Sequence, residues 1–155
     1  MVESLKETLT DIYIVPADGG SPRPFLTSPS NENAAMFSSD GSWIAYSSDE
    51  SGQYEIYVTR YPQGGRRWLV STGGGVEPEW RADGKELFYQ NGAKFMAVDV
   101  KQGTDFSSGK PRVLFESDFR GSFNVAADGS RFLIVKREKP TPRTQINVVS
   151  GLSVR

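Results

Sequence analysis

A repeat of about 44 residues, three Asp-Gly pairs in register and the lack of any sustained helical periodicity predict an all-β fold. The pairs Asp40-Gly41, Asp83-Gly84 and Asp128-Gly129 stand 43 and 45 residues apart. Four short strands fit into each repeat, and this repeat length and strand count are typical of β-propeller blades. We therefore expect blades of four antiparallel strands. The chain holds about three and a half of them, as part of a six- to eight-bladed ring or half of a dimeric one.

Each Asp-Gly pair predicts a β-hairpin. The Asp carboxylate can accept hydrogen bonds from the backbone just ahead, and Gly tolerates the positive φ of a tight turn. Large or branched apolar residues stand at fixed positions on both sides of the turn, three before each Asp and three after each Gly. These residues are Phe37, Trp80 and Val125 on the first side and Ile44, Leu87 and Phe132 on the second. The three Asp-Gly pairs are thus interpreted as structural turns, not as acids or metal ligands.

The remaining strands divide the chain into blades. Pairs of apolar residues at 25–26, 68–69 and 113–114 keep the same spacing as the hairpins, and similar strands recur at 11–15, 55–58, 95–98 and 146–149. We expect residues 1–10 to form an N-terminal tail and residues 11–155 a partial propeller. The expected blades are 11–27 (partial), 34–71, 76–116 and 121–149 (partial). Gly73-Gly74-Gly75 falls between two blades and predicts a tight crossover.

Composition excludes much chemistry. The 18 basic and 19 acidic residues nearly cancel, so we expect neither nucleic acid nor a membrane surface as a partner. The chain has no Cys and no His, which removes the thiolate nucleophile, the commonest general base and the commonest metal ligands. We expect no catalytic residues, no metal and no cofactor. Residues 1–10 carry two Glu and lack the apolar core of a secretory signal, so no signal peptide is expected in this chain.

Residues 37–46, Phe-Ser-Ser-Asp-Gly-Ser-Trp-Ile-Ala-Tyr, together with Glu-Ile-Tyr-Val at 55–58, resemble the TolB-like β-propeller repeat. That resemblance implies a WD-repeat-like propeller in a periplasmic or otherwise extracytoplasmic setting. A narrower likeness involves Asn31-Glu32 and residues 71–75, 80–89 and 129–133. Their order resembles the C-terminal propeller of bacterial receptor-like serine/threonine kinases, although the sequence contains none of the kinase motifs.

In such propellers the connections between blades, and those between the second and third strands of a blade, share one face around the central channel. Loops on a rigid scaffold commonly carry function. We therefore expect any binding site among the polar side chains of these loops. The candidates are Asn31, Glu32, Asn33, Asp49, Glu50, Glu77 and Arg120.

The sequence thus predicts a non-catalytic interaction or sensing module with a protein or peptide partner, cut from a larger TolB-like or kinase-linked protein. One alternative is a purely structural repeat fragment, which would be recognised by whether the chain folds alone. Two further alternatives place the chain in an enzyme. The first is the propeller domain of a prolyl oligopeptidase-like hydrolase, whose catalytic domain would have to lie elsewhere. The second is a propeller glycosidase, which would need two carboxylates that converge near the channel. Because an open arc leaves strand edges exposed, a homodimer that completes the ring is also expected.

Overall fold

The computed structural model describes residues 10–135, which contain strands and loops and no helix. The strands are β1 Ile12–Ile14, β2 Arg23–Leu26, β3 Glu32–Phe37, β4 Trp43–Ser48, β5 Glu55–Arg60, β6 Arg67–Leu69, β7 Val76–Trp80, β8 Glu86–Asn91, β9 Lys94–Lys101, β10 Ser107–Ser108, β11 Arg112–Glu116, β12 Phe123–Val125 and β13 Phe132–Ile134. Within residues 10–135, no helix has the length and hydropathy of a membrane span.

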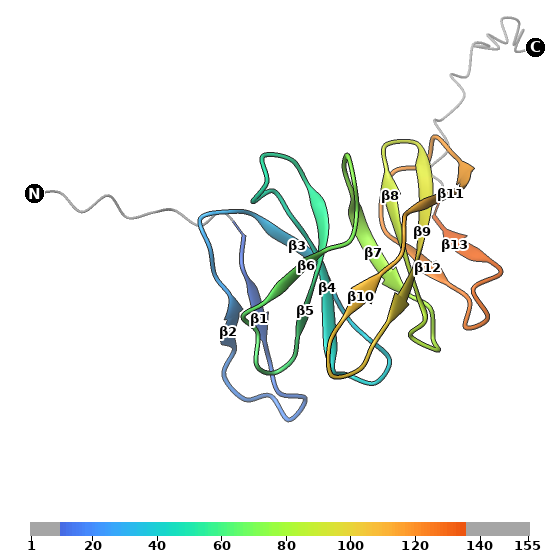
Figure 1. Cartoon of the computed structure of the whole chain (residues 1–155). Helices are drawn as coiled ribbons and strands as arrows, with labels where there is room; N and C mark the ends of the chain where they lie inside the picture. Colours follow the sequence, from blue (N-terminus) through green and yellow to red (C-terminus); the bar gives the residue numbers. More distant parts are fainter. Residues whose placement is uncertain (1–9, 136–155) are drawn as a thin grey trace, which may run out of the picture.

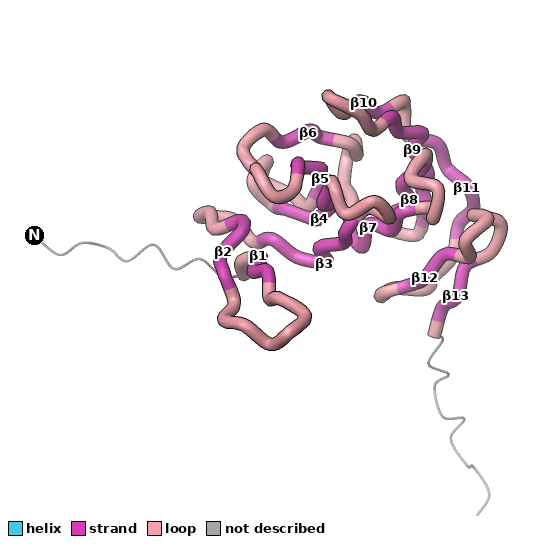
Figure 2. The backbone as a smooth tube through the Cα atoms, turned by 90° about the horizontal axis from the view of Figure 1, so that it is seen from below, coloured by secondary structure: helices cyan, strands magenta, loops and turns pink. Residues whose placement is uncertain are grey.

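The strands form four antiparallel sheets that follow one another along the chain. The second sheet has the order β3-β4-β5-β6, and the third has the order β7-β8-β9 with β10 and β11 both paired to β9. The β1–β2 and β12–β13 pairs form two-stranded sheets at the two ends (Figure 1). Figure 2 shows these sheets side by side in an open arc. The predicted all-β fold with propeller blades is confirmed.

The predicted division into an N-terminal tail and four blades stays a prediction. Most of the tail, residues 1–9, lies outside the described residues, and so does the strand expected at Ile146–Val149. Thr10 is described, and its carbonyl accepts a hydrogen bond from the Glu32 amide.

The three Asp-Gly turns have the same backbone geometry. In each turn the Gly amide donates to the carbonyl three residues earlier, from Gly41 to Ser38, from Gly84 to Arg81 and from Gly129 to Ala126, at 2.7–2.9 Å. The Gly φ angles are 69°, 68° and 74°, in the left-handed region that a residue with a Cβ adopts only at a cost. A repeated sequence pattern therefore produces a repeated hairpin.

Apolar side chains fill the spaces between successive sheets. Because neighbouring residues of a strand point to opposite faces, the second strand of each complete sheet serves two interfaces. On β4, Ile44 and Tyr46 pack toward the β1–β2 pair, whereas Trp43 and Ala45 pack toward the third sheet. This explains why all six residues of β4 are buried.

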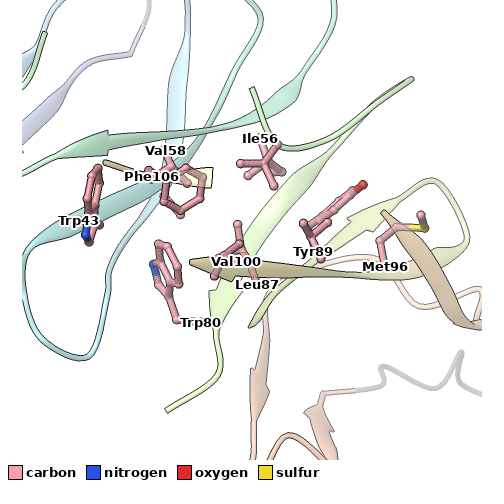
Figure 3. Packing of buried hydrophobic residues seen from close by; sticks show 12 residues of the cluster. Trp43, Ile56, Val58, Trp80, Leu87, Tyr89, Met96, Val100 and Phe106 are labelled. Atoms are coloured by element: carbon pink, nitrogen blue, oxygen red, sulfur yellow. The ribbon is translucent and has the colours of Figure 1, made fainter. Parts of the chain in front are cut away.

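The largest apolar cluster lies between the second and third sheets (Figure 3). Trp43 and Trp80, from different sheets, both contact Phe106, with ring centroids 5.5 and 6.5 Å away. Phe106 belongs to the connection between β9 and β11, which also forms the short strand β10. Neither β10 nor the burial of Phe106 was predicted from the sequence. A third cluster, rich in Phe, joins the third sheet to β12 and β13.

The crossover predicted at Gly73-Gly74-Gly75 joins β6 to β7. The buried Glu55 carboxylate holds it in place, because it accepts hydrogen bonds from the Gly74 amide at 2.8 Å and from the Ser71 hydroxyl. Ser71 Oγ in turn accepts from the Ile56 amide at 2.7 Å. One buried carboxylate thus connects the second sheet to the start of the third.

Candidate functional site

A pocket of about 450 Å³ lies where the inner strands of three successive sheets begin. Ala34 of β3 and Glu77 of β7 occupy equivalent positions, 43 residues apart, at irregularities in strand pairing. Both have positive φ, 50° and 54°. Ser122, which directly precedes β12, stands 45 residues after Glu77. The full lining consists of Asn33, Ala34, Ser47, Tyr54, Val76, Glu77 and Ser122.

Two of the predicted binding residues, Asn33 and Glu77, line this inner-strand pocket. The Asn33 side-chain amide donates a hydrogen bond of 3.0 Å to the Tyr54 hydroxyl, so its orientation is set. Ser47 is buried on β4, and its hydroxyl has no hydrogen-bond partner. A buried polar group without a hydrogen-bond partner costs free energy. A bound group that hydrogen-bonds the Ser47 hydroxyl would therefore be stabilised.

Asn31 and Asp49 bind each other instead. The Asn31 amide and side-chain Nδ2 donate to the two Asp49 carboxylate oxygens at 2.8 and 2.7 Å. These hydrogen bonds hold the Asp49 pKa below its ordinary value, the side-chain bond being the larger cause. The pair joins the connection before β3 to the connection between β4 and β5.

Glu32 and Glu50 also have partners within the chain. The Ser28 hydroxyl donates to the buried Glu32 carboxylate at 2.5 Å, and burial is the main reason that the Glu32 pKa is raised. Glu50 forms an ion pair with Arg67. Glu32 and Glu50 therefore help to hold the second sheet and its loops.

Arg120 folds back on its own loop. Its guanidinium donates to the backbone carbonyls of Ser117 and Phe119 at 3.3 and 3.2 Å. The next residue, Gly121, accepts a hydrogen bond of 2.7 Å from the buried side chain of Gln90. These contacts fix the connection from β11 to β12 beside the inner-strand pocket.

Of the carboxylates in residues 10–135, that of Glu77 alone belongs to the lining of the pocket. Glu79, two residues further along β7, has a raised pKa, mainly from burial and secondarily from the charge of Glu77. Residues 10–135 contain no group of three Asp or Glu side chains placed to hold a metal ion. In the part of the chain that the structure describes, the negative charge of the pocket thus comes from Glu77.

The Asp-Gly turns lie away from this pocket. Asp40 and Asp83, from adjacent sheets, line another pocket together with residues 100–102. The turns project from one end of the sheets, and the β4–β5 and β8–β9 connections from the other (Figure 1). In each turn the Asp Oδ1 accepts from the amide two residues ahead, at Ser42, Lys85 and Ser130.

These turn carboxylates contribute to stability in a pH-dependent way. Arg81 donates two hydrogen bonds to Asp83, at 2.7 and 2.8 Å, and lowers the Asp83 pKa to about 2. A lowered pKa in the folded state stabilises the fold above the ordinary Asp pKa near 4, and this contribution disappears as the pH falls toward 2.

We expect Asp83→Asn to lower the urea unfolding midpoint at pH 7 but not at pH 2. The exposed Asp118→Asn serves as the control. An equal loss at both pH values would contradict the assignment.

Sequence reasoning missed Ser47, Tyr54 and Ser122 as pocket residues. Ser122 could have been found, because it follows Glu77 by the spacing that separates Asp83 from Asp128. Ser47 and Tyr54 carry no such signal. Their place in the pocket depends on how β4 and β5 pair.

No protein-family model matches the sequence, and no curated protein matches it either. Among solved structures, the fold is similar to a protein assigned as TolB from Agrobacterium tumefaciens, with a TM-score of 0.56 and 19% sequence identity over 81% of this chain and 51% of that chain. TolB from Acinetobacter baumannii gives a TM-score of 0.48 and 19% identity over 83% of this chain and 43% of that chain.

The fold of residues 10–135 defines the class of protein as all-β, with antiparallel sheets arranged as part of a β-propeller. More particularly, its fold is similar to that of the protein assigned as TolB from Agrobacterium tumefaciens, of which the chain spans about half the length. An identity of 19% establishes the fold alone.

Proposed function

We propose that the chain is a non-catalytic interaction module that binds a protein or peptide segment in the inner-strand pocket. The observation that supports this function is the convergence of three inner strands on one concave site with polar side chains. Propellers and other repeat folds commonly use such sites, because the scaffold holds the loops rigidly.

The lining of the pocket favours a segment with a basic group. Among the described residues, Glu77 is the only charged member of the lining, and the buried Ser47 hydroxyl has no hydrogen-bond partner. An ammonium or guanidinium group could pair with Glu77, and a neighbouring polar atom of the segment could bond Ser47. A glycosidase would need a second carboxylate in the pocket, and the described residues of the lining supply none.

A peptide selection tests the proposal. A displayed library of random 12-residue peptides is selected on the whole chain, and the recovered peptides are measured by titration against Glu77→Gln. We expect Lys- or Arg-containing peptides whose affinity falls about tenfold in this variant, the loss that corresponds to one charged hydrogen bond. Glu116→Gln, on the exposed strand β11, should leave the affinity unchanged. Peptides that bind all three proteins equally well would refute the pocket as the site.

We further propose that the module works as a sensing or docking part of a larger TolB-like or kinase-linked protein, outside the cytoplasm, and that two copies associate. The similarity to about half of a TolB chain supports the first part, and the edges of β1 and β13, which pair with no further strand among residues 10–135, support the second. The complete reading frame of the gene tests the kinase link. A kinase domain encoded upstream is the expected result, and a reading frame without one would refute it.

A further inference from the structure

The sheets at the two ends of the arc are complementary halves. The β1–β2 pair occupies the third and fourth positions of a sheet, and the β12–β13 pair occupies the first and second. Within residues 10–135, β1 pairs only with β2, and β13 pairs only with β12. Each half-sheet therefore presents the edge that the other half would fill.

Equivalent residues are exposed at the ends and buried in the middle. Leu133 is 71% exposed, whereas Phe88, its equivalent 45 residues earlier, is 1% exposed. Tyr13 is 51% exposed and its equivalent Tyr57 is 6% exposed. The difference arises because Phe88 and Tyr57 face a neighbouring sheet, whereas nothing packs on Leu133 or Tyr13 in the described residues.

The inner strands show the same contrast. Phe37 and Trp80 are equivalent, 43 residues apart, but Phe37 is 44% exposed and Trp80 only 7%. Trp80 packs against the complete second sheet, and its indole donates a hydrogen bond of 3.2 Å to the Met36 carbonyl. Phe37 faces the β1–β2 pair, and residues 10–135 place no inner strands beside β1. A first and second strand placed beside β1 would cover Phe37.

We propose that β13 of one copy pairs with β1 of a second copy, so that β12-β13 and the second copy's β1-β2 form one four-stranded sheet. This inference specifies the contact through which the two copies proposed above associate. Head-to-tail contacts of this kind form a ring when the rotation closes. Two copies contribute four complete sheets and two composite ones, six in all.

The two complete sheets predict the register of the composite sheet. Ala45 pairs with Val58 in the second sheet, and Phe88 pairs with Ala97 in the third. By the same equivalence, Leu133 lies opposite Ile14 of the second copy, and Ile134 lies opposite Tyr13. Leu133 then faces the second copy's apolar cluster around Ile12 and Ile44.

A second copy covers more of the exposed surface than any other occupant that the chain offers. Residues 146–149 of the same chain could occupy the edge of β13, but they would leave β1, Tyr13 and Phe37 uncovered. Exchange between copies covers both ends at once. Because burial of apolar area drives association, the exchange is the favoured arrangement.

Disulfide cross-linking tests the contact directly, because the chain has no Cys of its own. Leu133→Cys and Ile14→Cys chains are mixed and oxidised. We expect a reducible cross-linked dimer in the mixture and none from either variant alone. The pair Leu133→Cys with Ile12→Cys, two residues out of register, should cross-link about tenfold more slowly, since diagonal neighbours lie near the limit for a disulfide.

Two results would overturn the inference. One is a failure of the in-register pair to cross-link. The other is an intrachain disulfide in the double variant Leu133→Cys/Val148→Cys, which would place the chain's own segment on β13. Light scattering of the unmodified chain separates this inference from the wider proposal. A monomer at all concentrations refutes both, whereas a dimer without the cross-link refutes only the strand exchange.

A charge substitution gives an independent readout. Leu133→Glu changes an exposed side chain, so the circular dichroism spectrum should not change. We expect the dimer dissociation constant to rise at least about tenfold, because a carboxylate would be buried at the contact. Leu69→Glu, on the exposed outer strand β6, is the matched control and should remain dimeric. Equal dissociation constants for the two variants would contradict the contact.

Discussion

Replacement of Trp43 by Ala is expected to destabilise the chain by about 3–5 kcal/mol, the range for removing a large aromatic side chain from a packed core. Trp43 is buried between the second and third sheets, with its ring centroid 5.4 Å from that of Trp68 and 5.5 Å from that of Phe106. The Arg60 guanidinium covers the ring at 5.2 Å. Loss of the Trp43 side chain would leave a cavity between the second and third sheets that the two sheets cannot close. Urea unfolding followed by circular dichroism measures the effect.

Two further variants keep the Trp43 prediction open to refutation. Trp43→Phe retains a ring at the same place and should lose markedly less stability, so it remains measurable even where Trp43→Ala does not fold. Leu69→Ala, which removes an exposed side chain, should change the free energy of unfolding by less than about 0.5 kcal/mol. A loss below about 1.5 kcal/mol for Trp43→Ala would mean that this interface contributes little to the fold.

Gly75→Ala is expected to cost about 3 kcal/mol although it adds only one methyl group. A Cβ at Gly75 would lie 2.8 Å from Ile56 Cγ1 and 2.9 Å from Ser71 Cβ, closer than carbon atoms pack. Ser71 cannot move aside without losing its hydrogen bonds to the Ile56 amide and to Glu55. Overpacking and a broken buried hydrogen bond each cost about 1–3 kcal/mol. The shift of the urea midpoint measures the cost.

Gly103→Ala is the matched control for Gly75→Ala. Its Cβ would meet nothing closer than the Asp105 carbonyl oxygen at 3.8 Å, an ordinary contact. We expect a change within about 0.5 kcal/mol, because alanine also restricts the unfolded chain slightly. Equal effects at the two glycines would show that the crossover relaxes around the added methyl group.

The repeat made the hairpins and the order of the sheets predictable. Asp-Gly turns are local, since a few neighbouring residues determine their geometry. The residue-by-residue pairing of the third strand in each complete sheet was harder to predict from the sequence. Tyr46 pairs with Tyr57, and its equivalent Tyr89 pairs with Met96, so the structure makes Tyr57 equivalent to Met96. The sequence alignment of residues 55–58 with 95–98 instead makes Tyr57 equivalent to Ala97. The connections before these strands differ in length, and a shift of one residue exchanges the two faces of a strand.

The candidate site was predictable only in outline. Loop polarity identified Asn33 and Glu77, but it also selected Asn31 and Asp49, which bind each other. Whether a polar side chain faces a pocket or a neighbouring loop depends on three-dimensional contacts that residue type does not encode. For the same reason, the sequence did not predict that Glu55 is buried and holds the crossover between β6 and β7.

The separation of the apolar side chains into three clusters, each between successive sheets, has a consequence for how such chains evolve. Every sheet recognises only its immediate neighbours, so stability behaves approximately as a sum of nearest-neighbour contributions. Duplication of one 43- to 45-residue unit in the gene would insert a sheet that already has suitable neighbours on both sides. Growth and loss of whole units are therefore small evolutionary steps, whereas a change in the spacing within one unit disturbs two interfaces at once.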